Sequence, residues 1–289
     1  MPEYLSADVL LADARLRIEA FQNRLGVLMV EGPDDKRLFY TRAYDPSQII
    51  ATGGRTLLLS AYEKASSADL DGMLFLTDCD YAVRRGELSG GMTGLIITVG
   101  TTIESDIVSL GTLPAVVMEV VPTAVSSNRL ASVCDEIMRL STLIALPIGR
   151  VRMAIQPLGV DVGLGELDIS KYWLKSQEKF DEEKLSIVVG RKLRSQGVSV
   201  DLDALVAKTP PDDRMCNGKD LLRAMRFILR GKYKVPTDIN DTVLCKMLRL
   251  AVSDTEFESW DVVARMRRWE SETGKALLVR PRRPPDDQT

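Results

Sequence analysis

The first 110 residues alternate short apolar runs with stretches in which apolar and charged positions follow a helical spacing. Apolar runs at residues 25–31, 48–51, 72–77 and 95–99 predict strands. The stretches between them predict helices, at 8–24, 35–43 and 53–65, and another beginning after Thr101-Thr102. Strands that are apolar throughout are typical of a parallel sheet buried on both faces. The order of these elements therefore predicts an α/β fold, with a parallel sheet and helices on both faces.

The second half of the chain has a different pattern. Residues 127–143 predict a helix, residues 155–168 are irregular and glycine-rich with one further strand pair expected, and helices dominate from residue 171. The final segment, RPRRPPDDQT from Arg280, has the composition of a disordered tail. We therefore expect a sheet domain at 1–125, a mainly helical domain at 126–279 and a disordered tail at 280–289.

Composition places the chain among ordinary globular proteins. Of its 289 residues, 45% are hydrophobic and 27% are charged. No apolar run approaches the roughly 20 residues that a membrane span needs. The four cysteines are widely spaced without a CxxC pair, which is typical of reduced thiols in the cytosol. We expect a cytoplasmic protein without a membrane segment.

The chain contains no histidine. This excludes catalytic triads and dyads that use histidine, and it excludes zinc or iron sites with histidine ligands. Acid–base or metal chemistry must then depend on carboxylates, lysine, tyrosine, cysteine or water. Clustered oxygen ligands favour Mg²⁺ or Mn²⁺.

Carboxylates follow two of the predicted strands. Glu31 ends the first strand, and Asp78 and Asp80 follow the third. Ligands bind at the carboxyl ends of parallel strands, so three carboxylates would converge if these strands are neighbours. Asp78 and Asp80 would point to the same side, and Cys79 into the core, if the backbone stays extended. Carboxylates this close need a cation, and a divalent metal is the natural partner. The alternative for Glu31 taken alone is a turn or helix-capping residue.

Two motifs carry a resemblance. VEGPDDKRLFY, from Val30, resembles the glutamate motif of the Toprim domain of topoisomerases, primases and related nucleases, and LFLTDCD, from Leu74, resembles its Asp-x-Asp motif. TTIESDIVSL, from Thr101, and CNGKDLL, from Cys216, are similar to elements of one Toprim subfamily. That subfamily includes the nuclease subunit of the PARIS anti-phage defence system, and it often has histidine at the position of Lys219.

The resemblance implies a function and its residues. Glu31 would be a general base or metal ligand, and Asp78 and Asp80 would be catalytic metal ligands. Glu104 would add a further acidic ligand, and whether it belongs to a second metal site is left open. The alternative for Glu104 is a first-turn glutamate that stabilises a helix N-terminus. The implied activity is a toxic endonuclease that uses Mg²⁺ or Mn²⁺ to cut RNA such as tRNA, or DNA. An ABC-type ATPase partner and an active homodimer are also implied.

Positive charge gathers between Arg214 and Arg249, where nine Lys/Arg face three acidic residues. Within this segment Arg223, Arg226 and Arg230 fall on one helical stripe, which predicts a track for nucleic-acid phosphates. An ordinary solvated helix face is the alternative. Arg84 and Arg85, in a glycine-rich loop after the third strand, could touch substrate beside the metal or simply belong to a connector.

Two other functions stay open. A nucleotide-sugar transferase would use Asp78-x-Asp80 to hold a diphosphate through a metal, but it would leave Glu31 without a role. A non-catalytic Toprim-fold subunit would serve as a scaffold that binds a partner.

Overall fold

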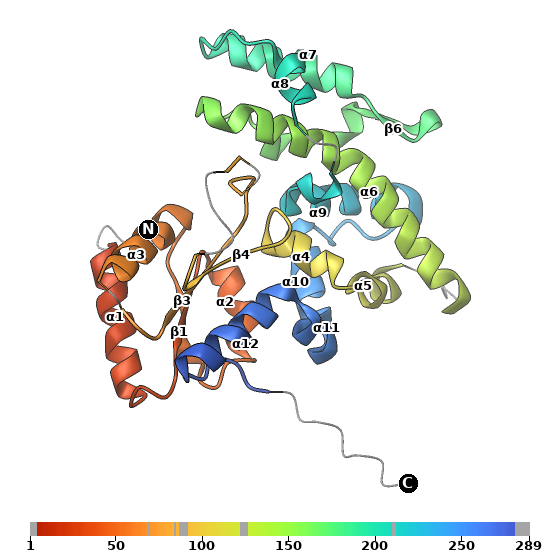
Figure 1. Cartoon of the computed structure of the whole chain (residues 1–289). Helices are drawn as coiled ribbons and strands as arrows, with labels where there is room; N and C mark the ends of the chain where they lie inside the picture. Colours follow the sequence, from red (N-terminus) through yellow and green to blue (C-terminus); the bar gives the residue numbers. More distant parts are fainter. Residues whose placement is uncertain are drawn as a thin grey trace. The chain divides into compact units, whose positions relative to one another are not determined.

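The computed structural model describes residues 5–68, 70–83, 85–86, 92–121, 127–209 and 212–280 (Figure 1). The chain forms two compact units. The sheet unit combines residues 1–99 with residues 254–289, and the helical unit is residues 100–253. Arg84 of the predicted loop and residues 281–289 of the predicted tail lie outside the described residues.

The sheet unit contains a four-stranded, fully parallel sheet in the order β2-β1-β3-β4. The four predicted strands are confirmed, with shorter bounds: β1 (Val27–Val30), β2 (Ile49–Ala51), β3 (Met73–Thr77) and β4 (Leu95–Ile97). The helices of this unit are α1 (Ala7–Ala20), α2 (Pro33–Tyr40), α3 (Arg55–Ser67), α11 (Asp254–Ser259) and α12 (Asp261–Thr273). The α/β fold class with a parallel sheet is therefore confirmed.

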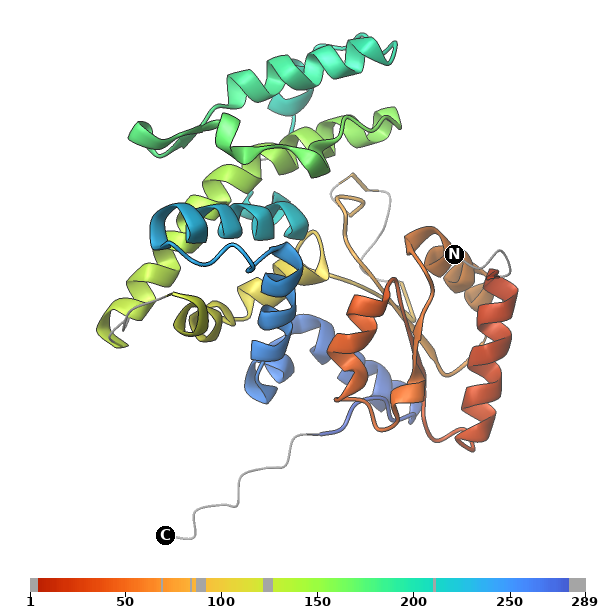
Figure 2. The same ribbon diagram turned by 180° about the vertical axis from the view of Figure 1, so that it is seen from behind.

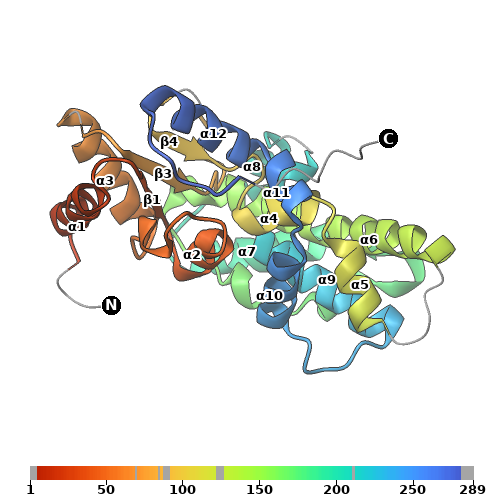
Figure 3. The ribbon, with the colours of Figure 1, turned by 90° about the horizontal axis from the view of Figure 1, so that it is seen from below.

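Helices cover both faces of the sheet, because strand side chains alternate between two cores. Val27 and Met29 of β1 belong to the core that α1 and α3 complete. Leu28 and Val30, also fully buried, point to the opposite face. There α2 packs against β1 and β2, and α12 packs against β4 (Figure 3).

The sheet unit is completed by residues from the end of the chain. The ring of Phe39, on α2, stacks on Trp260 with ring centroids 6.0 Å apart. The amide of Gln48, just before β2, donates hydrogen bonds to the carbonyls of Gly26 (2.8 Å) and Ala276 (3.0 Å). These contacts explain why the observed units differ from the expected domains 1–125 and 126–279. The C-terminal helices bury their apolar faces in the sheet unit, which linear patterning along the chain does not reveal.

The helical unit is built around α6 and α9, which pack along one another (Figures 1 and 2). Its helices are α4 (Ile103–Ser109), α5 (Leu113–Val120), α6 (Ser127–Ile155), α7 (Glu182–Ser195), α8 (Leu202–Ala207), α9 (Gly218–Tyr233) and α10 (Asp241–Ala251). A two-residue antiparallel pair joins β5 (Trp173–Leu174) to β6 (Lys179–Phe180). The mainly helical character predicted for this part of the chain is confirmed.

Two local predictions for the helical unit are wrong. The helix expected to end at residue 143 continues to Ile155 and includes Pro147. The strand pair expected within residues 155–168 is absent from that described segment, where Gln156–Leu158 and Leu164–Glu166 form 3₁₀ turns. Gly159 and Gly163 have φ of 66° and 64°, left-handed values that interrupt an extended strand.

No helix in the described part of the chain combines the length and the apolar character needed to cross a membrane.

Candidate functional site

The predicted carboxylates lie where the direction of the sheet connections changes. From β1 the chain crosses to β2 on one side, and β3 then pairs with the other side of β1. In open parallel sheets, ligands bind at such a switch point, outside the carboxyl ends of the strands. Glu31 directly follows β1, and Asp78 and Asp80 follow β3. We call Glu31, Asp78 and Asp80 the strand-end site.

Glu31 is fixed against the end of β3. Its Oε1 accepts a hydrogen bond from the Thr77 hydroxyl at 2.6 Å and another from the backbone N–H of Asp78 at 2.9 Å. Burial raises the pKa of the Glu31 carboxyl, and these two hydrogen bonds offset part of the effect. The contact between Glu31 and the Asp78 backbone confirms that the two strand ends meet. Within the described chain, no residue donates a hydrogen bond to the other oxygen, Oε2.

The chain turns at Asp80. Asp80 and Tyr81 have φ of 45° and 78°, left-handed values that are unusual for residues other than glycine. The expectation of an extended backbone through Asp80 is therefore wrong, and with it the argument that Asp78 and Asp80 point to the same side. Cys79 is buried in the core between them, as expected. Consecutive left-handed residues beside a candidate site are typical of backbone held in place by surrounding structure.

Arg55 belongs to the same place and was missed by sequence reasoning. Its Nη1 donates to the backbone carbonyl of Asp78 at 2.8 Å and lies 3.2 Å from Asp80 Oδ2. Gly53 and Gly54, with φ of 89° and 140°, allow the chain to turn sharply from β2 into α3, and Arg55 is the first residue of that helix. An arginine directly after paired glycines at the end of a strand was the available signal.

The donor types at the strand-end site suit Mg²⁺ or Mn²⁺, since they are carboxylate oxygens. Burial is the main cause of the raised pKa of Glu31, and the charge of Asp80 raises it further. Among the described residues, however, no three cysteine, aspartate or glutamate side chains already form a metal-holding group. The chemistry of the donors therefore fits a divalent cation, and Asp80 is engaged by Arg55 in the present arrangement.

Glu104 lies in the helical unit, in the first turn of α4. It is close to the start of α9, because a Cβ added at Gly218 would lie 2.8 Å from the Glu104 Cβ and 2.2 Å from Thr102 Oγ1. The hydroxyl of Thr101 donates to the carbonyl of Cys216 at 2.9 Å. The segments TTIESDIVSL, from Thr101, and CNGKDLL, from Cys216, therefore pack against each other.

The arginine stripe on α9 has partners inside the helical unit. Arg223 donates to the carbonyls of Leu164 and Leu167. Arg226 pairs with Asp241 at 3.1 Å, and Arg230 donates to carbonyls of the segment that follows α9. These contacts favour a structural role for the stripe over a phosphate track. Arg85, the described member of the loop pair, is partly exposed.

Asp220, within CNGKDLL, is a buried ionic centre that sequence reasoning did not single out. Its side chain is fully buried. The guanidinium of Arg152, on α6, binds both of its oxygens, at 2.5 and 3.0 Å, and Arg223 lies 3.3 Å from Oδ1. The position of Asp220 therefore explains part of this motif as a link between α6 and α9, while Lys219 is exposed.

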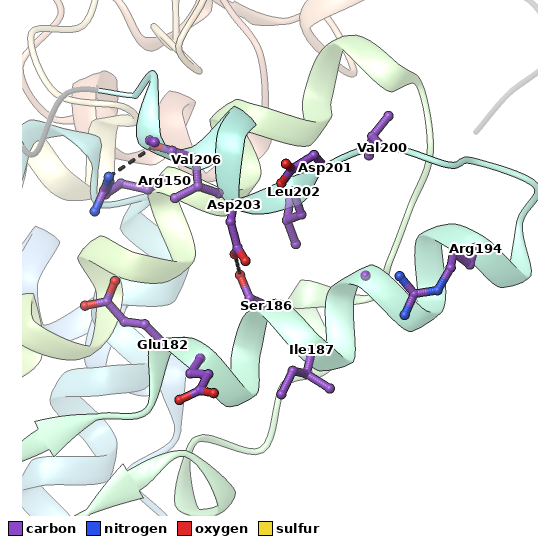
Figure 4. A pocket seen from close by; sticks show the side chains of 13 residues that line it. Arg150, Glu182, Ser186, Ile187, Arg194, Val200, Asp201, Leu202, Asp203 and Val206 are labelled. Carbon is purple, nitrogen blue, oxygen red and sulfur yellow. Dashed lines mark hydrogen bonds between the residues drawn. The ribbon is translucent and has the colours of Figure 1, made fainter.

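A groove of about 720 Å³ lies between α7 and α8 in the helical unit (Figure 4). Ser186 on α7 donates to Asp203 on α8 at 2.6 Å across it, and Ile187 is among the apolar residues exposed there. Arg150 of α6 reaches it while donating to Thr209 and to the Val206 carbonyl. None of the predicted site residues lines this groove.

In comparisons with known proteins, no family model, no curated protein and no solved structure matches the chain.

Proposed function

We propose that this chain is a metal-dependent nuclease whose active centre is the strand-end site. One observation carries the proposal. Glu31, a partly buried carboxylate, is hydrogen-bonded to the backbone of Asp78 at the switch point between β1 and β3. Such points are where parallel sheets bind ligands. The resemblance to Toprim nucleases, which rests on the motifs around Glu31 and Asp78, supplies the reaction class.

Each residue has a proposed role. Burial makes the Glu31 carboxylate bind a proton or a cation more strongly than an exposed glutamate does, which suits a general base or a metal ligand. Thr77 and the Asp78 N–H fix Oε1, so Oε2 is the oxygen that would face water or metal. Asp78 and Asp80 would supply the remaining carboxylates. When bound, Mg²⁺ or Mn²⁺ would polarise the scissile phosphate and stabilise the charge that develops on it.

The finer assignments also belong to the proposal. The substrate is RNA such as tRNA, with DNA as the alternative, and the context is anti-phage defence with an ATPase partner and an active homodimer. These rest on the resemblance alone. Glu104 and the α9 arginines are not needed by the proposed centre. A transferase that uses only Asp78 and Asp80 fits less well, because it gives no role to the fixed position of Glu31.

The test is cleavage of labelled tRNA, single-stranded RNA and plasmid DNA with Mg²⁺ or Mn²⁺. Glu31→Gln and Asp78→Asn should abolish metal-dependent cutting. Asp71→Asn is the matched control, since Asp71 is an exposed aspartate near the opposite end of β3. The assay is repeated with the ATPase partner that the resemblance implies. If neither setting yields cleavage, the nuclease proposal fails and the scaffold alternative takes its place.

A further inference from the structure

Arg55 is the charged residue at the strand-end site to which the proposed function gives no role. Its guanidinium bridges two parts of the turn after β3, the carbonyl of Asp78 and the carboxylate of Asp80. The pair with Asp80 is partly accessible, with side-chain exposures of 22% for Arg55 and 34% for Asp80. Ion pairs that solvent can reach are weak, so this one can be opened by a competing cation.

The positive charge of Arg55 lies directly against Asp80, since Nη1 is 3.2 Å from Oδ2. Arg55 thus supplies next to this carboxylate the positive charge that a divalent cation would supply there.

We propose that Arg55 is an internal counter-cation that competes with a divalent metal ion for the carboxylate of Asp80. This inference rests on the proposed function, because it assumes that Asp80 is a metal ligand. In the present arrangement Arg55 holds Asp80. A metal ion binds when the Asp80 carboxylate leaves the guanidinium.

The second contact of Arg55 determines where the guanidinium stays. The hydrogen bond to the Asp78 carbonyl does not involve Asp80, so it keeps Arg55 at the site after the ion pair opens. Nη1 makes both contacts, so opening of the ion pair releases one Nη1 N–H, which then suits a phosphate oxygen, a preferred partner of arginine. Metal binding and phosphate binding would therefore strengthen one another, since linkage between two sites is reciprocal.

The inference is tested by measuring the affinity for Mn²⁺ alone, from the paramagnetic resonance signal of free Mn²⁺ in titrations of the full chain. Arg55→Gln should bind Mn²⁺ about tenfold more tightly than wild type, because the competing charge is gone. Arg17→Gln is the matched control. Arg17, on α1 of the same unit, also bridges a carboxylate (Asp13) and a backbone carbonyl (Ser47), with 30% of its side chain exposed. Its substitution should leave Mn²⁺ affinity unchanged.

Two further variants separate competition from support of the turn. Arg55→Lys keeps the charge and should stay near the wild-type affinity. In an Asp80→Asn background, Arg55→Gln should no longer tighten Mn²⁺ binding, because the contested carboxylate is absent. Unchanged or weaker Mn²⁺ binding by Arg55→Gln would overturn the inference, and weaker binding rescued by lysine would assign Arg55 to positioning the turn.

The two proposals fail in different ways. If wild type cuts nucleic acid with metal but Arg55→Gln binds Mn²⁺ no more tightly, only the competition is wrong. If neither wild type nor Arg55→Gln binds Mn²⁺ and nothing is cut, the metal-dependent nuclease falls, and the inference falls with it.

Discussion

Replacing Glu31 by glutamine should stabilise the sheet unit while it removes the proposed activity. The amide oxygen of glutamine can still accept the hydrogen bonds from Thr77 and the Asp78 N–H. The substitution therefore removes mainly the charge whose burial raises the pKa of this carboxyl. The difference in stability between wild type and Glu31→Gln then measures what the native charge costs the folded state.

The magnitude and pH dependence follow from that raised pKa. Glu31→Gln should therefore gain unfolding free energy at pH 7, and each tenfold difference in acid strength between the folded and unfolded states corresponds to about 1.4 kcal/mol of that gain. A raised pKa means that the folded state holds the proton more tightly than the unfolded chain does. Wild type and Glu31→Gln should therefore converge below the ordinary value of 4.5 and separate as pH rises through the folded pKa.

The assay is urea unfolding from pH 3.5 to pH 7.5, followed by tryptophan fluorescence. Two of the three tryptophans, Trp260 and Trp269, lie in the sheet unit with Glu31. Glu63→Gln, at an exposed position on α3, is the control and should show no such difference. A loss of stability in Glu31→Gln at pH 7, or a gain that persists unchanged at pH 3.5, would refute this reasoning.

Three other outcomes are expected from unfolding measurements. Asp220→Ala should cost about 3–5 kcal/mol because it leaves two arginines without their buried partner, whereas Arg139→Ala, in an exposed pair, should cost less than about 1 kcal/mol; equal costs would contradict this. Gly218→Ala should destabilise by about 1–3 kcal/mol through its clash with Thr102, while Gly231→Ala, in the same helix with nothing within 4 Å, should be neutral or stabilising. Removal of residues 275–289 should unfold the sheet unit at a lower urea concentration, because the backbone contacts of residues 276–278 are lost, and an unchanged midpoint would show that these contacts do not stabilise the unit.

The sequence was informative where the signal was local. The apolar runs ending at Glu31 and Asp78 predicted the parallel sheet, and the two strand ends were expected to meet if those strands were neighbours, which β1 and β3 are. Arg55 was missed because its contact with Asp80 joins residues 25 positions apart. The contact also depends on the left-handed turn at Asp80 and Tyr81, which no sequence pattern predicted.

Elsewhere the same periodicity was compatible with two structures. The stripe on α9 marks one helix face, but spacing alone cannot say whether that face meets solvent or carbonyl groups. Arg223 and Arg230 meet carbonyls supplied by segments outside the helix. The compact units differ from the expected domains for a similar reason, since Trp260 packs on Phe39 from a distant part of the chain.

The two-segment construction of the sheet unit sets an order for folding during synthesis. Residues 5–99 leave the ribosome long before residues 254–280, which carry part of the same core. The helical unit is continuous, so it can fold while the sheet still lacks α11, α12 and the strand-like contacts of Ala276. Nascent chains interrupted before residue 254 would carry the three carboxylates without a finished scaffold. For the proposed nuclease, this would make activity depend on the synthesis of residues 254–280.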